Sequence, residues 1–340
     1  MAHGPLFTHF ESSLAHDTGP GHPERADRMV ALAGLLDQHA CFGYVLAASP
    51  AATDAQLTAV HPPGHVAAIR ALCASGGGAI DADTVVSAGS ESAARHGAGG
   101  VCALVDALLV DDGPRVGASL HRPPGHHAEA ARAMGFCLYN SVAVGARWAL
   151  DHHGLERVLV LDVDVHHGNG TNAIFHAEPR VLFVSVHEWP LYPGTGREDD
   201  VGSGAGAGYS VNVPVPGGSG DAAFCSIIEH AVAPLARTWR PQLVLVSAGF
   251  DAHGDDPLAS CTVSDAGYAT MAASVRRFAD AVGAPVGVVL EGGYELGALT
   301  RGLRATLDAV AAAPEAAPET LVEHPLAVAA LARARAAGLA

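Results

Sequence analysis

Five short segments of this 340-residue chain are aliphatic at almost every position, and they constrain the fold more than any other feature. Strands that are half exposed alternate apolar and polar residues, whereas strands buried on both faces are continuously hydrophobic. The five runs cover residues 115–120, 157–165, 180–186, 242–249 and 284–290. The stretches between and after them suit helices, which we expect over 137–152, 221–238, 264–282 and 297–312. This alternation predicts a single α/β domain built on a parallel sheet.

The segments before and after the five aliphatic runs are expected to be helices, loops and one linker. Before the first run we expect helices over 24–38, 64–75 and 92–110, joined by Gly-rich loops. The Ala/Pro-rich segment 311–320 is typical of a linker. We therefore expect a catalytic domain over 1–312, followed by a linker and a C-terminal helix over 313–340.

The overall composition excludes several classes of protein. Hydrophobic residues make up 49% of the chain, which is enough for a large core. The formal charge is −16 and every positive residue is Arg, so nucleic acid is a poor partner. The six cysteines form no C-x-x-C motif, the first residues do not resemble a secretory signal, and no apolar run is long enough to cross a membrane. We expect a cytoplasmic protein with reduced thiols.

Polar and ionisable segments follow all five aliphatic runs. Ligands of open parallel sheets bind beyond the carboxyl ends of the strands. The segments are HRPPGHHAE, DVDVHHGNGT, HEWPLYPGTG, FDAHGDDPL and EGGYE. Because each buried ionisable group must be paired at an energetic cost, their repeated occurrence at strand ends predicts a functional site there.

The densest of these segments predicts a metal site. At strand period, Asp162, Asp164 and His166 share one face, and carboxylate plus imidazole ligands suit Zn²⁺, with Fe²⁺ as the competing ion. A third ligand is expected from another strand end, where Asp251 is favoured over His253. A buried charge network without metal is the structural alternative.

Two further segments carry groups suited to proton transfer. The adjacent imidazoles of His126 and His127 follow a stiff Arg-Pro-Pro sequence and could act as acid and base near neutral pH. Tyr294 follows two glycines, and its phenol could donate a hydrogen bond to a developing oxyanion. Either feature alone is as compatible with ordinary packing as with catalysis.

Taken in order, these motifs resemble the histone deacetylase superfamily, and in particular class II and bacterial histone-deacetylase-like amidohydrolases. The resemblance covers roughly residues 5–310 and rests on RPPGHH, GFCLYNSVAV, LDVDVHHGNGT, SVH with YPGTG, SAGFDAHGDDPL and LEGGY. It implies a single-domain, arginase-like three-layer fold whose central eight-stranded parallel sheet is flanked by helices.

The resemblance also implies a role for each matching residue. The zinc ligands are Asp164, His166 and Asp251, and the catalytic residues are His126, His127 and Tyr294, with Asp162 orienting the first histidine and Asn169 the second. A structural K⁺ is implied at the side chains of Asp162 and Ser185 and the backbone carbonyls of Asp164, His166 and Val186.

The activity implied is hydrolysis of the acyl amide of Nε-acyl-lysine in proteins or peptides, releasing acetate when the acyl group is acetyl. The substrate would enter a narrow tunnel lined by Gly135, Phe136, Tyr192, Leu258 and Gly293. Tyr192 departs from the family, which usually has Phe at that position. Dimers and tetramers both occur among such relatives, so a homo-oligomer is compatible with the resemblance.

Three alternative functions differ from this one at identifiable residues. Polyamine-selective relatives carry an acidic residue seven positions after the last zinc-ligand Asp, and Leu258 stands there, which favours acyl-lysine over small N-acetylated amines. Arginase-like enzymes need an acidic ligand where this chain has Gly168. A catalytically inactive reader of acyl-lysine would not need every catalytic position to be filled, as they are here.

Overall fold

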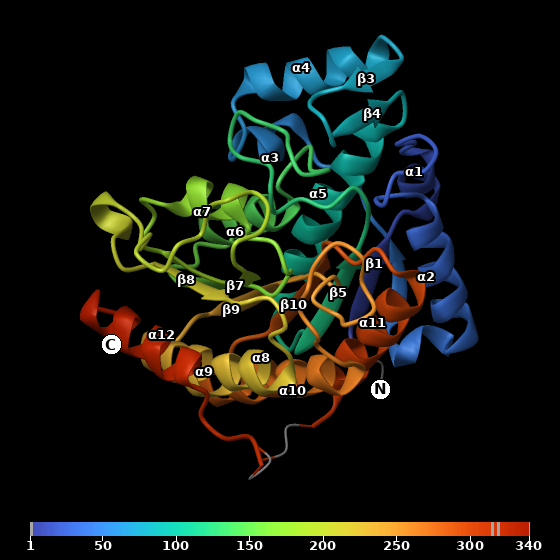
Figure 1. The fold of residues 1–340 in the computed structure, drawn as a ribbon. Coiled ribbons are helices and arrows are strands. Elements are labelled where there is room, and N and C mark those ends of the chain that lie inside the picture. Colours follow the sequence, from blue (N-terminus) through green and yellow to red (C-terminus); the bar gives the residue numbers. More distant parts are fainter. Residues whose placement is uncertain (1–2, 314–315, 318–319, 340) are drawn as a thin grey trace. The chain divides into compact units, whose positions relative to one another are not determined.

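All five aliphatic runs form strands in which every residue is buried. The structure, a computed structural model, describes residues 3–313, 316–317 and 320–339 (Figure 1). The five strands are β5 (Val116–Leu120), β6 (Val158–Asp162), β7 (Val181–Glu188), β9 (Leu243–Ala248) and β10 (Val286–Leu290). Each large aliphatic side chain buried in this way stabilises the fold by roughly 1.5–3 kcal/mol.

These strands belong to an eight-stranded sheet with the order β2-β1-β5-β10-β9-β6-β7-β8. Strand β6 pairs in parallel with β7 and β9, and Asp162 lies opposite Ser185 on one side and Ser247 on the other. The carboxyl ends of these three strands therefore meet at one edge. The predicted fold class, a single-domain α/β fold whose parallel eight-stranded sheet is flanked by helices, is confirmed.

Three strands of this sheet were not predicted. They are β1 (Pro5–Thr8), β2 (Val45–Ala48) and β8 (Ser210–Val215). The first two are only four residues long, and β8 contains Ser, Asn and Pro, so none has the long aliphatic pattern of a central strand. A separate antiparallel pair joins β3 (Gly77–Ala79) to β4 (Val85–Ser87).

One compact unit of the chain comprises Met1–Gly154, Gly168–Ile174 and Gly287–Gly292. Its core includes Leu57, Ile69, Leu138 and Tyr139, all at most 5% exposed. The helices in this part of the chain are α1 (Phe10–Ala15), α2 (Asp27–Gln38), the short 3₁₀ segment η1 (Ala40–Gly43), α3 (Asp54–Thr58), α4 (Pro63–Ala74), α5 (Ser90–Leu108), α6 (Ser141–Asp151) and α7 (Asn169–Phe175).

The other unit comprises Leu155–His167, Phe175–Val286 and Gly293–Ala340. The helix predicted over 221–238 forms as three consecutive segments, with a π-helical stretch in the middle. The helical elements are α8 (Asp221–Ile227), η3 (Ile228–Val232), α9 (Ala233–Trp239), the short 3₁₀ segment η2 (Gly204–Gly206), α10 (Asp265–Val282), α11 (Leu296–Ala311) and α12 (Pro325–Ala336).

Polar side chains at the N-termini of α10 and α8 differ in what they bond to: Ser264 caps its helix, and Asp221 does not. Ser264 caps α10 by accepting a hydrogen bond from the backbone N–H of Gly267, as its position predicts. Asp221, the first residue of α8, does not cap its own helix: the N-cap position is Gly220, and no side chain caps it. The Asp221 carboxylate instead accepts hydrogen bonds from the backbone N–H and the hydroxyl of Ser264, at 2.8 and 2.6 Å, and so ties α8 to the start of α10.

The C-terminal helix α12 packs within the second unit, against η3 and α8. Ala327, Ala330 and Ala334 are buried along one side of it, and the backbone N–H of His324 donates to the hydroxyl of Ser226 at 2.7 Å. Residues 314–315 and 318–319 of the predicted linker lie outside the described residues. Among the described residues, no helix is long and apolar enough to span a membrane, and none of the six cysteines, all described, forms a disulfide.

Candidate metal centre and catalytic residues

Two strand ends bring three potential metal ligands together in the second unit. Asp164 and His166 follow β6, and Asp251 follows the neighbouring strand β9. One ligand atom from each of these residues lies within 4.8 Å of the others. Asp164, His166 and Asp251 are 1%, 8% and 0% exposed, so the group is buried.

The local geometry differs from the strand predicted over 157–165. Strand β6 ends at Asp162, and a turn follows, so Asp164 and His166 do not share the face of a strand. Side-chain oxygens shape this turn instead. Asp162 Oδ1 accepts from the N–H of Asp164 at 3.1 Å, Asp164 Oδ1 from the N–H of His166 at 2.9 Å, and Asp251 Oδ1 from the N–H of Val165 at 3.0 Å. These bonds fix the three carboxylates against the backbone that carries Asp164 and His166.

The electrostatics of the group call for a cation. Nδ1 of His166 lies 3.2 Å from Asp164 Oδ1 and 3.1 Å from Asp251 Oδ2. Burial alone lowers the pKa of His166, but the hydrogen bonds and charges of Asp164 and Asp251 outweigh it and raise this pKa to about 10. Burial and the nearby charge of Asp164 raise the pKa of Asp251 to about 7. Two buried carboxylates in one group stay ionised together only beside a positive charge, which a protonated His166 or a bound cation can supply.

This donor set fits Zn²⁺. Two carboxylate oxygens and one imidazole nitrogen are ligands that Zn²⁺ accepts, and three protein ligands leave a position open for water or substrate. Fe²⁺ accepts the same ligands. The rival ligand His253 is turned elsewhere: its Nε2 pairs with Asp265 Oδ1 at 3.0 Å, and its Nδ1 accepts from the N–H of Asp255 at 3.0 Å.

Gly249 has no side chain, and the carboxylate of Asp164 occupies the space beside it. A Cβ atom built on Gly249 would lie 2.2 Å from Oδ2 of Asp164, which no side chain can tolerate. The sequence Ser-Ala-Gly at the end of β9 therefore allows the Asp164 carboxylate to sit against the backbone.

The loop after β7 places Tyr192 beside this group. The rings of Tyr192 and His166 meet edge to face with centroids 6.4 Å apart. Two histidines hold the loop: Nε2–H of His187 donates to the carbonyl of Gly196 at 2.8 Å, and His167 Nδ1 pairs with the Thr195 hydroxyl at 2.8 Å. Burial lowers the pKa of His187 to about 4, so this histidine is a neutral structural group.

Tyr294 is held by a carboxylate that sequence reasoning missed. Asp256 Oδ2 accepts hydrogen bonds from the backbone N–H groups of Tyr294 and Glu295, at 2.6 and 3.1 Å. Asp256 Oδ1 accepts from the N–H of Leu258 at 3.1 Å. Asp256 therefore fixes the backbone of two predicted substrate-site residues, although its only signal in the sequence is its place in the HGDDPL segment.

The paired histidines lie in the first unit with a defined hydrogen-bond partner. The ring centroids of His126 and His127 are 4.0 Å apart. Nδ1 of His127 lies 2.8 Å from Oδ1 of Asn169, and the amide group of Asn169 donates to Glu129 at 3.0 Å. Because the Glu129 carboxylate can only accept, the amide orientation is set, and Nδ1 of His127 must carry the proton. Its Nε2 is then the basic nitrogen.

A buried charge network fixes the segment that carries these histidines. Arg122 forms a bidentate pair with Glu24, both N–O distances being 2.7 Å, and Arg28 reaches Glu24 at 3.2 Å. All three side chains are 0% exposed. Glu291 accepts from the backbone N–H groups of Gly125 and His126, at 2.6 and 3.1 Å. Glu291 lies in the EGGYE segment, whereas nothing in the sequence distinguished Glu24.

Gly135, a predicted tunnel residue of the first unit, packs against His127. A Cβ atom on Gly135 would lie 2.4 Å from Cδ2 of His127, so the imidazole fills the space of the missing side chain. Gly135 and Phe136 both have positive φ angles, of 57° and 69°. Positive φ is unusual for Phe, and strain of this kind collects at functional sites. The Phe136 ring also meets His22 edge to face at 4.8 Å.

The remaining predicted residues lie in the second unit. Asp162 and Ser185, the side chains implied for K⁺, are directly opposite each other on β6 and β7, and both are 0% exposed. Val186, the next residue of β7, is also fully buried. Leu258 is half-buried, and Gly293 adopts a φ of 114° with Phe250 closing the space beside it.

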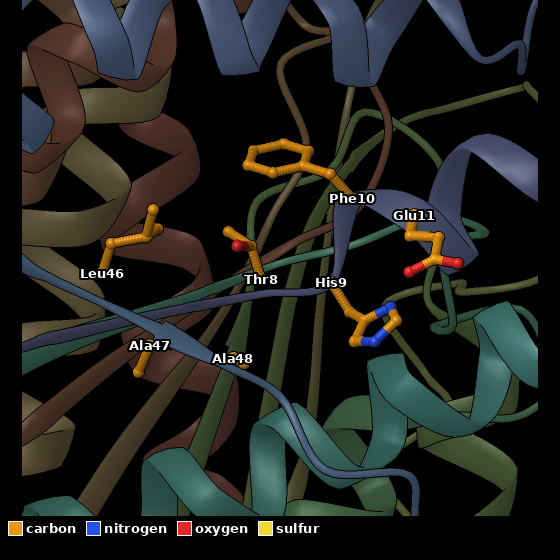
Figure 2. A pocket seen from close by; sticks show the side chains of 7 residues that line it. All are labelled: Thr8, His9, Phe10, Glu11, Leu46, Ala47 and Ala48. Atoms are coloured by element: carbon orange, nitrogen blue, oxygen red, sulfur yellow. The ribbon is translucent and has the colours of Figure 1, made fainter.

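The carboxyl ends of β1 and β2 form a separate hollow of about 330 Å³ (Figure 2). It is lined by Thr8, His9, Phe10, Glu11, Leu46, Ala47 and Ala48. Its one imidazole is engaged locally, since His9 accepts from the N–H of Ser12 and its ring stacks on His96 at 3.7 Å. This hollow therefore lacks the convergent groups of a catalytic site.

Comparison with known proteins agrees with this arrangement. Residues 22–310 match the histone deacetylase domain family. The chain is 39% identical over 277 residues to the histone deacetylase-like amidohydrolase of Pseudomonas aeruginosa, an alignment that covers 81% of this chain and 73% of that protein. It is 37% identical over 290 residues to a probable deacetylase of Archaeoglobus fulgidus, covering 84% and 80%.

Plant relatives and a solved structure extend the comparison. Histone deacetylase 14, chloroplastic, of Arabidopsis thaliana is 43% identical over 208 residues, or 60% of this chain and 49% of that protein. The chain thus spans about half the length of this relative. The crystal structure of the HDA15 HD domain superposes with a TM-score of 0.89 at 34% identity, covering 99% of this chain and 94% of that domain.

Proposed function

Because the chain belongs to the histone deacetylase family, we propose that it is a zinc-dependent amidohydrolase acting on Nε-acyl-lysine in peptides or proteins. Water would cleave the amide to a free lysine amine and a carboxylate, which is acetate when the acyl group is acetyl. The observation that carries the proposal is the buried group of two carboxylates and one imidazole at Asp164, His166 and Asp251.

These three residues are proposed to hold the ion. Bound Zn²⁺ supplies Lewis-acid polarisation of the acyl carbonyl and lowers the pKa of a water molecule. The side chain–backbone hydrogen bonds that fix Asp164, His166 and Asp251 would keep the ligands in place while the substrate enters. Fe²⁺ is the competing occupant.

His127 is proposed to move the protons. Nδ1 of His127 is protonated because it faces Asn169 Oδ1, so Nε2 can take a proton from the attacking water and return it to the leaving amine. His126 stands beside it, held by the Glu291 carboxylate through its backbone N–H. We assign Asp162 the role of orienting His126.

Tyr294 is proposed to stabilise the charge that develops on the acyl oxygen. Its phenol O–H would donate a hydrogen bond to the oxyanion more strongly than to the ground-state carbonyl. Asp256 supports this role, since it fixes the backbone of Tyr294 and Glu295 at their N–H groups.

The acyl-lysine side chain is proposed to pass Gly135, Phe136, Tyr192, Leu258 and Gly293. Flat aromatic side chains suit a linear aliphatic amine. Leu258 carries no charge to attract a second ammonium group, and this supports acyl-lysine over acetylated polyamines. K⁺ is proposed between Asp162 and Ser185 with the carbonyls of Asp164, His166 and Val186, because Asp162 and Ser185 are buried partners in the register of β6 and β7 and offer a carboxylate and a hydroxyl.

The substrate is tested by comparing kcat/KM for an acetyl-lysine peptide with that for N-acetylputrescine and N8-acetylspermidine. We expect the peptide to be favoured by tenfold or more, and Leu258→Glu to shift the preference toward the polyamines. A tenfold preference of the unchanged protein for the small amines would refute the lysine assignment.

The metal is tested on the same protein by chelation and reconstitution. We expect chelation to abolish hydrolysis and to lower the Tm, because an ion that binds only the folded state stabilises it. Zn²⁺ should restore both, and Mg²⁺ should restore neither. Asp251→Asn should remain inactive when Zn²⁺ is added, and its Tm should respond to Zn²⁺ less than that of the unchanged protein. Retained activity after complete metal removal would contradict the proposal.

A further inference from the structure

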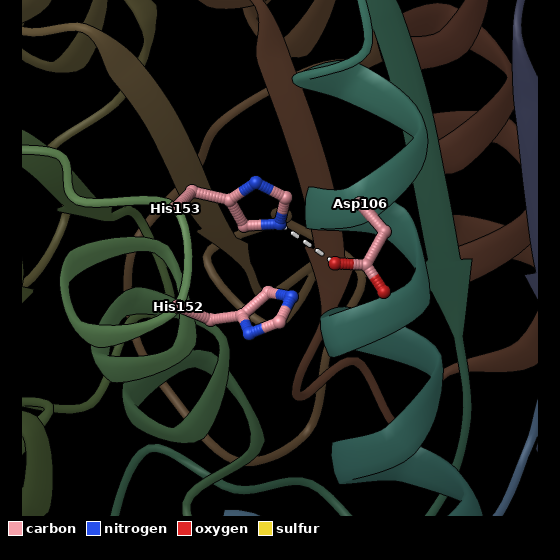
Figure 3. A group of neighbouring side chains, drawn as sticks. All are labelled: Asp106, His152 and His153. Atoms are coloured by element: carbon pink, nitrogen blue, oxygen red, sulfur yellow. Dashed lines mark hydrogen bonds and ion pairs between the residues drawn. The ribbon is translucent and has the colours of Figure 1, made fainter.

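A second group of potential metal ligands lies on the surface of the first unit, at the ends of two packed helices (Figure 3). Asp106 belongs to the last turn of α5, and His152 and His153 directly follow α6. One ligand atom from each lies within 4.8 Å of the others. Because Asp106 and His153 are partly exposed and His152 is exposed, an ion could reach the group from solvent.

Trp148 contacts two of the three ligands, and the third ligand pairs with Asp106. Its indole N–H donates to Asp106 Oδ1 at 2.7 Å, and its ring stacks on His152 with centroids 4.0 Å apart and planes 11° apart. Nε2 of His153 lies 2.7 Å from the same Asp106 oxygen. Neighbouring groups that hold metal ligands in one orientation lower the entropic cost of binding an ion.

The surroundings favour positive charge. Both α5 and α6 end at this group, and the last turn of a helix carries unpaired carbonyls and the negative end of the helix dipole. The chain as a whole has a formal charge of −16. A cation placed between Asp106 and the two imidazoles would therefore be attracted by all of these features.

We propose that Asp106, His152 and His153 form a second metal site, separate from the Asp164 group, that takes a divalent transition ion of the Zn²⁺ class. Two imidazole nitrogens and one carboxylate oxygen select Zn²⁺, Ni²⁺ or Cu²⁺ over Mg²⁺ and Ca²⁺, which prefer all-oxygen ligands. Water completes the coordination, because the site opens to solvent. The ion would join the end of α6 to α5.

The first test measures the number of Zn²⁺ ions bound by the full chain, by equilibrium dialysis with metal analysis. We expect His152→Ala/His153→Ala to bind one equivalent fewer than the unchanged protein. Asp106→Asn, which keeps the acceptor for Trp148 but loses the charge, should bind the same ion more weakly. Since all variants keep the Asp164 group, this difference does not depend on catalytic activity.

A matched control is offered by His176. Its Nε2 lies 2.8 Å from Asp200 Oδ1, so it forms the same kind of histidine–carboxylate pair without a second imidazole. His176→Ala should bind as much Zn²⁺ as the unchanged protein. Equal stoichiometry in His152→Ala/His153→Ala and the unchanged protein would overturn the proposal.

The second test uses Trp148, one of three tryptophans in the chain, as a reporter. Cu²⁺ bound at this site would lie close to the indole of Trp148 and quench its fluorescence. We expect a saturable quenching component that excess Mg²⁺ leaves unchanged and that disappears in His152→Ala/His153→Ala and in Trp148→Phe. Quenching that survives the double substitution, or that Mg²⁺ abolishes, would refute a site at these residues.

Discussion

The side-chain amide of Asn169 determines which nitrogen of His127 can act as a base. Its N–H₂ end donates to Glu129 and its oxygen faces Nδ1 of His127, so the imidazole presents Nε2 for proton transfer. The amide accepts the hydrogen bond from Nδ1–H of His127 without placing a negative charge beside the ring. A carboxylate at the same position would favour the protonated imidazole instead.

Substituting Asn169→Asp therefore tests the base directly. A negative charge about 2.8 Å from Nδ1 should raise the pKa of His127, so the acidic limb of the pH profile of kcat/KM should move to higher pH. Activity below neutrality then falls more than activity at high pH. Glu129→Gln removes a charge that contacts Asn169 rather than Nδ1 of His127, so it should move the acidic limb much less. A folded, active Asn169→Asp enzyme with an unchanged profile would exclude His127 as the titrating base.

The phenol of Tyr294 can be tested against another buried tyrosine. Tyr294→Phe should lower kcat about a hundredfold or more with little change in stability, which is the scale of one lost oxyanion donor. Tyr268→Phe is the control, since Tyr268 is 2% exposed and its hydroxyl makes no hydrogen bond within the described part of the chain. Steady-state kinetics and thermal unfolding of both variants decide the matter, and equal kcat values would argue against the role of Tyr294.

At the scale of elements, the segment that carries His126 and His127 is anchored by ionic contacts rather than by secondary structure. Residues 121–140 contain no helix or regular strand. Burial alone would raise the pKa of Glu24, but the charge of Arg122 and its hydrogen bonds hold this pKa well below 4.5. Glu24 is thus ionised in the folded protein and joins α2 to the Arg122 segment.

Breaking this anchor should be costly. Glu24→Gln leaves two buried guanidinium groups short of a counter-charge, and we expect a loss of about 3–5 kcal/mol in the free energy of unfolding. Urea unfolding at neutral pH measures it. Asp54→Asn removes an exposed partner of Arg70 and should change the midpoint little. Similar small shifts in both variants would contradict an anchoring role for Glu24.

The elements that sequence predicts are those whose pattern needs no tertiary context. Strands β6, β7 and β9 are buried on both faces and are recognisable from aliphatic residues alone. Helix α7 begins with Asn-Gly-Thr, which is typical of a turn, and it forms where the N–H groups of Gly170 and Thr171 bond to the carbonyl of His126. A contact across more than forty residues leaves no local signal.

In the candidate site, too, some residues have a local signal in the sequence and others depend on tertiary contacts. Asp164, His166 and Asp251 could be predicted, since burying ionisable residues at the ends of aliphatic strands is costly unless they bind a charged group. Glu24, Glu291 and Asp256 could not, because the hydrogen bonds by which they fix Arg122, Gly125 and Tyr294 come from groups 38 to 166 residues away. Their importance appears only when the backbone positions are known.

At the scale of the whole molecule, several of the 20 histidines are structural and neutral. His61 donates from Nδ1 to the carbonyl of Ala130 and accepts at Nε2 from the N–H of Asn140, an arrangement that an imidazolium cannot make. Burial lowers the pKa of His61 and of His187 to about 4, and that of His121 to about 3.

These histidines predict a loss of stability in mild acid. Below an unfolded-state pKa of about 6.5 the unfolded chain binds protons that the folded protein excludes, so each histidine lowers the free energy of unfolding by up to about 1.4 kcal/mol per pH unit. The loss should begin near pH 6.5 and continue to about pH 4 for His61 and His187. Denaturant unfolding between pH 7 and 4 measures this slope.

Two substitutions separate this effect from general acid sensitivity. His61→Gln should reduce the slope, whatever its effect on stability at pH 7, because one excluded proton is gone. His3→Gln, at an exposed position, should change the slope much less. If stability is flat from pH 6.5 to 5, these histidines are not held neutral by the fold.

The glycines at 135 and 249 have a consequence for how such a protein can diversify. Each occupies a position where even a methyl group would collide with His127 or Asp164, so neither can drift to another amino acid. Tyr192 and Leu258 are only half-buried and have room for other side chains. Mutational libraries of this chain should yield altered specificity from positions 192 and 258, while 135 and 249 return glycine alone among active clones.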